Sequence, residues 1–146
     1  MAPYSREYDI KRNDIANAGT VASLTKRALK NLGLTGEFIK QVTIGVYEAE
    51  INVVIHSYGG QAHVTIDNDF VEIIFEDKGP GIANIEQALT AGFSTASSYA
   101  IENGFGAGMG LPNIQAVSDE MDLQSSEDGT YLRIKFYIEE DDYASA

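Results

Sequence analysis

Three polar residues, Glu48, Asn52 and His56, are spaced by four in one apolar segment of the sequence. Residues four apart project from the same side of a helix, so the three would form a polar stripe. The amide oxygen of Asn52 suits a hard cation such as Mg²⁺, and Glu48 can accept a proton or orient an attacking hydroxyl. A solvated helix face would show the same spacing. We assign His56 no catalytic part, because a histidine at a helix end is commonly satisfied by its neighbours.

A second group of residues lies at the ends of two expected strands. In EDKGPGI, Asp77 ends a strand, and Gly79 and Gly81 permit a tight turn. A carboxylate at a strand end can accept a hydrogen bond from an adenine amino group, and glycines beside it let the backbone approach the ring. Gly129 and Thr130 stand just before the last strand. Taken alone, each of these stretches also fits an ordinary turn.

The stretch GFGAGMGLPN, residues 104–113, places Gly106, Gly108 and Gly110 in a GxGxG spacing. No strand precedes it, so it lacks the context of a dinucleotide fingerprint, and it lacks the GK[ST] of a Walker loop. Pro112 fits the first turn of a helix, where its missing N–H has no intrahelical partner. The sequence therefore predicts a flexible glycine-rich lid that leads into a helix N-terminus, whose free N–H groups and positive dipole end suit phosphate.

The remaining sequence predicts the elements that position these residues. Apolar spacing of three or four predicts helices over 15–32 and 38–56, a capping box at Asn84 and Gln87 opens a helix over 84–91, and another follows over 113–118. Alternating or apolar β-branched runs predict strands over 62–67, 70–77 and 131–138, the first two joined as a hairpin. Residues 92–110 form a long loop. The fold class is α+β: a two-layer α/β sandwich whose mixed, mostly antiparallel sheet carries helices on one face.

Composition limits the function classes. The 146 residues suggest one domain over 1–138, followed by an acidic tail over 139–146 that we expect to be disordered. Zero cysteines exclude disulfides, and the start of the chain lacks the features of a signal peptide, so we expect a cytoplasmic protein. No apolar run reaches the roughly 20 residues of a membrane helix. A formal charge of −12 disfavours nucleic acid as a partner.

In order, the stretches EAEIN, DKGPG, GFGAGMG and GT resemble the motifs of the GHKL superfamily of ATP-binding domains, over roughly residues 39–138. Within it, EDKGPGIANIEQALTAGFST and GAGMGLPNIQAVSDEM look most like the Ser/Thr kinases of sigma-factor partner-switching systems. This resemblance implies ATP and Mg²⁺, with the γ-phosphoryl group passed to a Ser or Thr of a STAS-domain anti-anti-sigma-type protein. It also implies a partner that is sequestered or activated, either a sigma factor or an effector phosphatase.

The resemblance also implies roles for single residues. Glu48 would be the general base, and Asn52 would hold Mg²⁺ between the phosphates. Asp77 would bind the adenine amino group. The other nucleotide-binding positions implied are Gly79, Gly81, Gly106, Gly108, Gly110, Leu111 and Thr130.

Three alternatives remain at this point. The run STASSYAIENGFGAG lacks the lysine of the TTKP motif that sporulation-type anti-sigma kinases carry, which favours the stressosome switch-kinase branch or an orphan relative. A histidine-kinase-like ATP-binding domain often has Asn where Glu48 stands. A nucleotide-gated interaction module with little catalysis would keep the same motifs. Residues 4–10 are a candidate homodimer contact by resemblance, and an ordinary edge strand would look the same.

Overall fold

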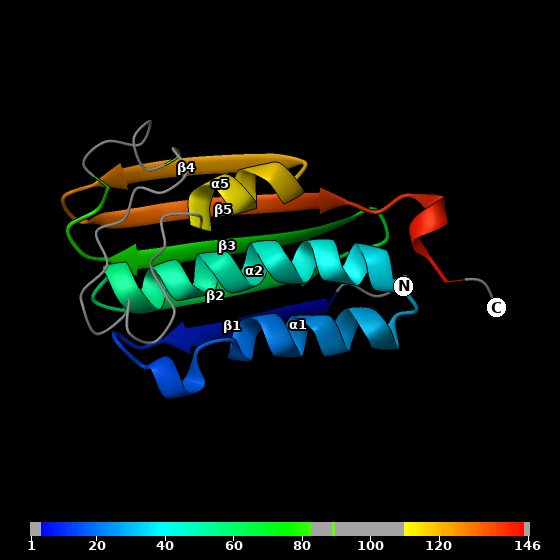
Figure 1. Cartoon of the computed structure of the whole chain (residues 1–146), viewed down its shortest axis with the longest axis horizontal. Coiled ribbons are helices and arrows are strands. Elements are labelled where there is room, and N and C mark those ends of the chain that lie inside the picture. The colour runs from blue at the N-terminus through cyan, green and yellow to red at the C-terminus, as the bar shows by residue number, and fades with distance from the viewer. Residues whose placement is uncertain (1–3, 83–88, 90–109, 145–146) are drawn as a thin grey trace.

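The computed structural model describes residues 4–82, 89 and 110–144, and in this part helices cover one face of a five-stranded sheet (Figure 1). The strands are β1 (Tyr4–Ile10), β2 (Gly60–Ile66), β3 (Phe70–Lys78), β4 (Glu120–Ser126) and β5 (Gly129–Tyr137), and the α-helices are α1 (Thr20–Asn31), α2 (Gly36–His56) and α5 (Gly110–Val117). The sheet order is β1-β2-β3-β5-β4, with every neighbouring pair antiparallel. The predicted α/β sandwich is confirmed, and the described strands contain no parallel pair.

The core lies between the sheet and the helices, as the alternating strands predict. Val71, Ile73 and Phe75 of β3 pair in register with residues of β5, and all three are almost fully buried. Each buried side chain of this size contributes about 1.5–3 kcal/mol. The residues between them, such as Glu72 opposite Lys135, lie on the other face of the sheet. None of the described helices has the length and apolar character needed to cross a membrane.

Helix α2 is the central element of the helical layer (Figure 1). It begins at Gly36, two residues before the predicted start, because the Thr35 hydroxyl caps it by accepting the Phe38 N–H at 3.3 Å. It ends at His56 as predicted, and the Ser57 hydroxyl donates to the Val53 carbonyl at 2.6 Å. Its predicted buried stripe is confirmed and comprises Val42, Val46, Ala49 and Val53.

The first predicted helix is wrong in its N-terminal part. Instead of one helix over 15–32, a 3-10 helix spans Ile15–Asn17 and α1 begins only at Thr20. Gly19 between them has φ 99°, which a right-handed helix does not contain. The apolar spacing continues across this break, so the spacing alone gave one helix.

Two further elements differ from the prediction. Strand β4, Glu120–Ser126, was not predicted, and it forms the edge of the sheet beside β5. Helix α5 begins at Gly110 and ends at Val117, so Pro112 lies in its first turn as predicted, but the helix starts three residues before 113. The predicted helix over 84–91 and loop over 92–110 lie outside the described residues, except Leu89 and Gly110.

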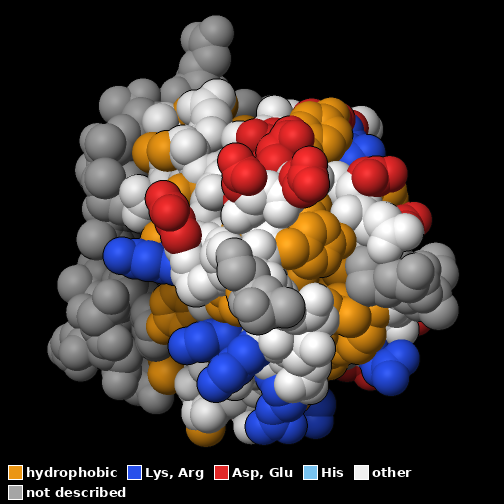
Figure 2. Space-filling view, turned by 90° about the vertical axis from the view of Figure 1, so that its right-hand side faces the viewer, with side chains coloured by type: hydrophobic (Ala, Val, Ile, Leu, Met, Phe, Trp, Pro, Cys, Tyr) orange, Lys and Arg blue, Asp and Glu red, His pale blue; other side chains and the backbone are white. Residues whose placement is uncertain are grey.

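The C-terminal segment is not a disordered tail over its described part, residues 139–144. A 3-10 helix spans Glu140–Asp142, the Asp142 carbonyl accepts the Thr35 N–H at 2.7 Å, and the Ala144 N–H donates to the Gly33 carbonyl at 2.7 Å. Figure 2 shows acidic side chains gathered on the end of the molecule that carries the C-terminus. Acidic composition suggested a solvated tail, and it did not reveal these backbone hydrogen bonds, which satisfy groups of the turn between α1 and α2.

Candidate functional site

Glu48, Asn52 and Gly110 come together where α2 meets the N-terminus of α5. Glu48 and Asn52 are half-buried and lie on the same side of α2. A Cβ atom at Gly110 would lie 3.1 Å from Asn52 Oδ1 and 3.4 Å from Glu48 Oε2. The two side chains therefore face bare backbone at the start of α5. The structure thus joins two of the regions that the sequence singled out separately.

Helix α5 is fixed against α2 by contacts at its other end. The Gln41 side-chain amide donates to the Val117 carbonyl at 2.6 Å. A Cβ at Gly45 would lie 3.3 Å from Val117 Cγ2 and 2.9 Å from the Phe136 ring, so the absent side chain lets α5 and the sheet approach α2. Leu111 and Ile114 are buried in the core. The Leu111 side chain therefore anchors α5, and only its backbone is left for the binding role that the resemblance implies.

Asp77 and Thr130 meet at the neighbouring ends of β3 and β5. Asp77 and Thr130 are directly paired between the two strands, and the Thr130 N–H donates to Asp77 Oδ1 at 3.0 Å. Burial raises the pKa of Asp77, and this hydrogen bond lowers it in part. Among the described residues, the second carboxylate oxygen of Asp77 accepts no hydrogen bond. Asp77 is half-buried, and this oxygen can therefore accept a hydrogen bond from a ligand.

Ser125 joins the turn after β3 to this pair, and sequence reasoning missed it. Its hydroxyl accepts the Ile82 N–H at 2.6 Å and lies 2.9 Å from the Thr130 hydroxyl. Ser125 is on β4, so the strand that was not predicted supplies it. The preceding Gly81 has φ 69°, and a Cβ there would collide with the Ser126 carbonyl oxygen and lie 2.8 Å from Ser125 Oγ.

Gly81→Ala is expected to lower the free energy of unfolding by about 2 kcal/mol, because it adds a steric clash to an unfavourable positive φ. Two glycines serve as controls in urea unfolding. Gly33→Ala has a positive φ but open space, so it should cost about half as much, and Gly36→Ala, inside α2 with open space, should be neutral or stabilising. Equal losses at Gly81 and Gly33 would show that the close approach to Ser126 does not matter.

The two halves of the candidate site are tied together behind Gly79. The Tyr58 N–H donates to the Lys78 carbonyl at 2.7 Å, and the Lys78 N–H donates to the Gly59 carbonyl at 3.0 Å. A Cβ at Gly79 would lie 3.2 Å from Ser57 Cα. The residues just after α2 therefore pack directly on the end of β3. This fixes the helix that carries Asn52 relative to the strand that carries Asp77.

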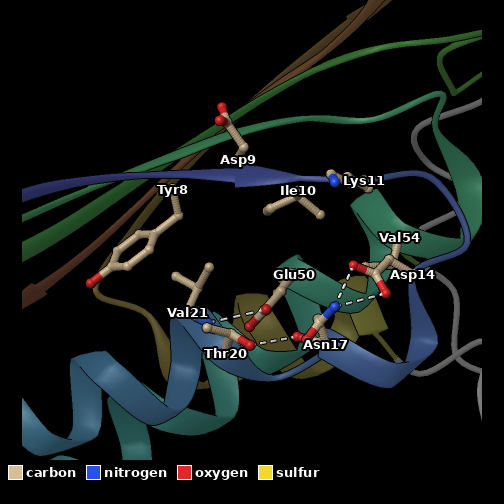
Figure 3. Close-up of a pocket in the computed structure, with 10 residues that line it drawn as sticks. All are labelled: Tyr8, Asp9, Ile10, Lys11, Asp14, Asn17, Thr20, Val21, Glu50 and Val54. Atoms are coloured by element: carbon tan, nitrogen blue, oxygen red, sulfur yellow. Dashed lines mark hydrogen bonds between the residues drawn. The ribbon is translucent and has the colours of Figure 1, made fainter.

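Glu50 is a buried carboxylate that the sequence reasoning overlooked. It is 2% exposed, and it accepts the N–H groups of Gly19 at 3.0 Å and of Val21 and Ala22 at 3.1 Å. Figure 3 shows it reaching from α2 to the start of α1, at one side of a pocket of about 300 Å³ that β1 also lines. Glu50 thus caps α1 from a neighbouring helix, since the N-cap residue Gly19 has no side chain to do so.

The pH dependence of stability tests the state of Glu50. Burial raises the pKa of Glu50 above its ordinary 4.5, although the backbone donors lower it in part. The folded chain therefore keeps this proton to higher pH than the unfolded chain, and the associated stability is lost as pH rises from about 4.5 through the raised pKa. Relative to Glu50→Gln, which cannot ionise, the wild type should lose unfolding free energy across that window. Parallel pH profiles of the two proteins in urea unfolding would contradict this, and Glu37→Gln in the first turn of α2 is the control.

The fold and the site together define the class of the protein. The chain belongs to the family of histidine kinase-like ATPase domains, whose profile matches residues 12–136, and the predicted GHKL membership is confirmed. It is 36% identical to the anti-sigma F factor of Heyndrickxia coagulans over 101 residues, which are 64% of this chain and 65% of that protein. It is 30% identical to the serine/threonine-protein kinase RsbT of Bacillus subtilis over 115 residues, 75% of this chain and 80% of that kinase.

A solved structure shares the fold. The RsbU and RsbW domains of a Mycobacterium tuberculosis protein superpose with a TM-score of 0.62 at 15% identity, covering 97% of this chain and 35% of that one. The chain therefore spans about a third of that solved chain and just under two thirds of the H. coagulans relative. Of the predicted site residues, Gly106 and Gly108 lie outside the described residues, and the roles of all of them stay predictions.

Proposed function

We propose that this chain is an ATP-dependent Ser/Thr protein kinase of a partner-switching system, which phosphorylates a STAS-domain anti-anti-sigma-type protein. The observation that carries the proposal is the meeting of Glu48 and Asn52 with the N-terminus of α5. Phosphoryl transfer needs a group to orient the hydroxyl nucleophile and groups to neutralise the phosphates, and these three positions offer both. The relatives named as anti-sigma factor and Ser/Thr kinase support the same class.

Glu48 is the proposed general base. Its carboxylate is half-buried, lies beside the bare backbone of Gly110, and can accept the proton of a Ser or Thr hydroxyl. Asn52, one turn further along α2, presents its amide to the same position. The spacing lets one rigid helix hold both groups at fixed separation.

The residues present could supply part of the coordination of a magnesium ion. Asn52 Oδ1 is a hard oxygen donor that faces the backbone at the start of α5, and Mg²⁺ prefers such donors. The described residues contain no group of three or more His, Cys, Asp or Glu side chains placed to hold a metal, so phosphate oxygens and water would supply the remaining ligands. Bound there, the ion would neutralise phosphate charge.

Phosphate neutralisation falls to the backbone as well as to the metal. The chain carries a formal charge of −12 and no P-loop lysine. Helix α5 begins at Gly110, so its free N–H groups and positive dipole end lie there, beside the side chain of Asn52. At the other end of the site, the free oxygen of Asp77 would accept the adenine amino group, while Thr130 and Ser125 hold the carboxylate and the turn in place.

Partner binding forms part of the proposal. A STAS-domain protein is the proposed substrate, and a sigma factor or effector phosphatase is the partner that the chain sequesters or activates. A second candidate, a nucleotide-gated anti-sigma module with little catalysis, is favoured by the name of the H. coagulans relative. Strand β1 is the outer strand of the sheet, so homodimerisation through residues 4–10 also remains a proposal, measurable by light scattering.

Incubation of the purified chain with Mg²⁺, [γ-³²P]ATP and a panel of purified STAS-domain anti-anti-sigma proteins tests the kinase proposal. We expect one or more of them to gain label on a Ser or Thr identified by mass spectrometry. Nucleotide-dependent binding of a panel member without any label would replace the kinase by the interaction module. If no panel member gains label and the chain binds no nucleotide, both the kinase and the interaction-module proposals are overturned.

A further inference from the structure

Two apolar side chains are exposed beside Glu48 on the outer side of α2. Ile44 and Tyr47 are each 37% exposed, and among the described residues the other large hydrophobic side chains this exposed are Tyr58 and Tyr137. Single exposed apolar residues are ordinary on a protein surface. These two differ because they adjoin each other and the proposed general base on one helix.

The positions of Ile44 and Tyr47 follow from helix geometry. Ile44 lies about one turn before Glu48 on the same face of α2, about 6 Å along the axis. Tyr47 lies beside them, toward α1. We call Ile44 and Tyr47 the α2 ridge. It continues directly from the proposed catalytic position, so a molecule that reaches Glu48 from that side also contacts the ridge.

Tyr47 is held in place by the start of α1. A Cβ at Gly19 would lie 3.3 Å from Tyr47 Cε2, so the ring packs against bare backbone there. The Gly19 N–H donates to Glu50 Oε2 at 3.0 Å, and this buried carboxylate therefore fixes the surface on which the ring lies. Burial raises the pKa of the Tyr47 hydroxyl, and Glu48 and Glu50 raise it further, so the ring stays uncharged. The exposed ring is thus both ordered and neutral.

We propose that the α2 ridge docks the segment of the protein substrate that carries the acceptor Ser or Thr, through an apolar side chain near that hydroxyl. The inference rests on the proposed kinase function. An acceptor hydroxyl has to come within hydrogen-bond distance of Glu48. An extended chain advances about 3.3 Å per residue, so a residue two positions from the acceptor reaches the level of Ile44.

The opposite face of the sheet is a poorer candidate for this contact. Several of its polar side chains contact one another: His63 lies 2.9 Å from Glu7, and Arg133 bridges Glu72 and Glu120 at 3.4 and 3.2 Å. Tyr137 lies on that face, with the Lys135 ammonium 5.7 Å from its ring centroid. Glu48 is on the helical side of the sheet, so a substrate bound to the polar face could not present a hydroxyl to it.

Steady-state kinetics on the STAS-domain protein that the wild type labels test this inference. The variants are Ile44→Ser, Tyr47→Ser and Tyr47→Phe, with Tyr137→Ser as the matched control, since Tyr137 is 43% exposed on the other face of the sheet. We expect each ridge Ser variant to raise the KM for the protein substrate about tenfold, a loss typical of an interface residue that contributes to binding, with kcat and MgATP affinity within twofold of wild type. Tyr47→Phe keeps the ring and should match the wild type.

The outcomes separate this inference from the proposed function. If the wild type labels its substrate and the ridge Ser variants keep the wild-type KM, the docking inference is overturned and the kinase proposal stands. Equal KM increases in Tyr137→Ser and the ridge variants would also overturn it, by showing a non-specific surface effect. Failure of the wild type to label any panel member removes the kinase proposal and this inference together. Thermal unfolding of each variant verifies that it is folded.

Discussion

Glu48→Gln is expected to lower the rate of phosphoryl transfer about 1,000-fold, within the range that general-base residues contribute. The substitution keeps the shape of the side chain and removes its ability to take a proton. MgATP affinity should change only a few-fold, because Asn52, Mg²⁺ and the start of α5 are the groups proposed to hold the phosphates. Single-turnover labelling of the STAS-domain substrate measures the first quantity, and equilibrium binding of a fluorescent ATP analogue measures the second.

Glu37→Gln is the matched control for Glu48→Gln, because Glu37 is an exposed glutamate on the same helix. It should transfer phosphate at the wild-type rate. If Glu48→Gln also transferred at that rate, Glu48 would not be the base. If the wild type itself transferred no phosphate to the substrate while binding nucleotide and partner, the chain would act as a nucleotide-gated interaction module.

Asp77→Asn is expected to weaken ATP binding about 100-fold, the value of a lost charge-assisted hydrogen bond plus an unpaired donor. The Thr130 N–H donates to one oxygen of Asp77, so the variant's amide oxygen should take that place and leave its NH₂ group facing the base. A donor then meets the adenine amino group. Guanine carries a carbonyl oxygen at that position, so the preference for ATP over GTP should fall sharply.

Competition of ATP and GTP against the fluorescent analogue measures this preference. Glu76→Gln is the control, because Glu76 is the exposed neighbour of Asp77 on β3. An unchanged ATP to GTP ratio in Asp77→Asn, with weaker binding of both, would show that Asp77 supports the site without reading the base. An unchanged ATP affinity in Asp77→Asn would show that the adenine ring binds elsewhere.

Strong local patterns made most of the fold predictable. The buried stripe of α2 and the strict alternation of Leu132, Ile134 and Phe136 in β5 each record one buried face, and both elements are confirmed within two residues at their predicted ends. Strand β4 was missed because it lies at the sheet edge, where no residue is fully buried and the alternation of EMDLQSS is weak. The break before α1 depends on the φ of Gly19, which apolar spacing does not encode.

The candidate site was predictable where its residues lie on one helix or strand, or where a glycine marks a turn. The shared face of Glu48 and Asn52 follows from helical spacing alone, and its approach to Gly110 depended on packing that only the structure gives. Glu50 was overlooked because it stands between Ala49 and Ile51, two residues from Glu48, and its partners at Gly19, Val21 and Ala22 lie far away in sequence. A charged residue on the buried side of an apolar helix was the available signal.

Isothermal titration calorimetry of the wild-type chain with ATP, in the presence of Mg²⁺ and then of a chelator, tests the central claim most directly. The claim is that Glu48, Asn52, Gly110 and Asp77 belong to one MgATP site. We predict one equivalent of ATP bound with Mg²⁺ and a large loss of affinity without it, because none of these four site residues is a lysine that could replace the ion. Absence of ATP binding with Mg²⁺ present, or equal affinity with and without the ion, would contradict it.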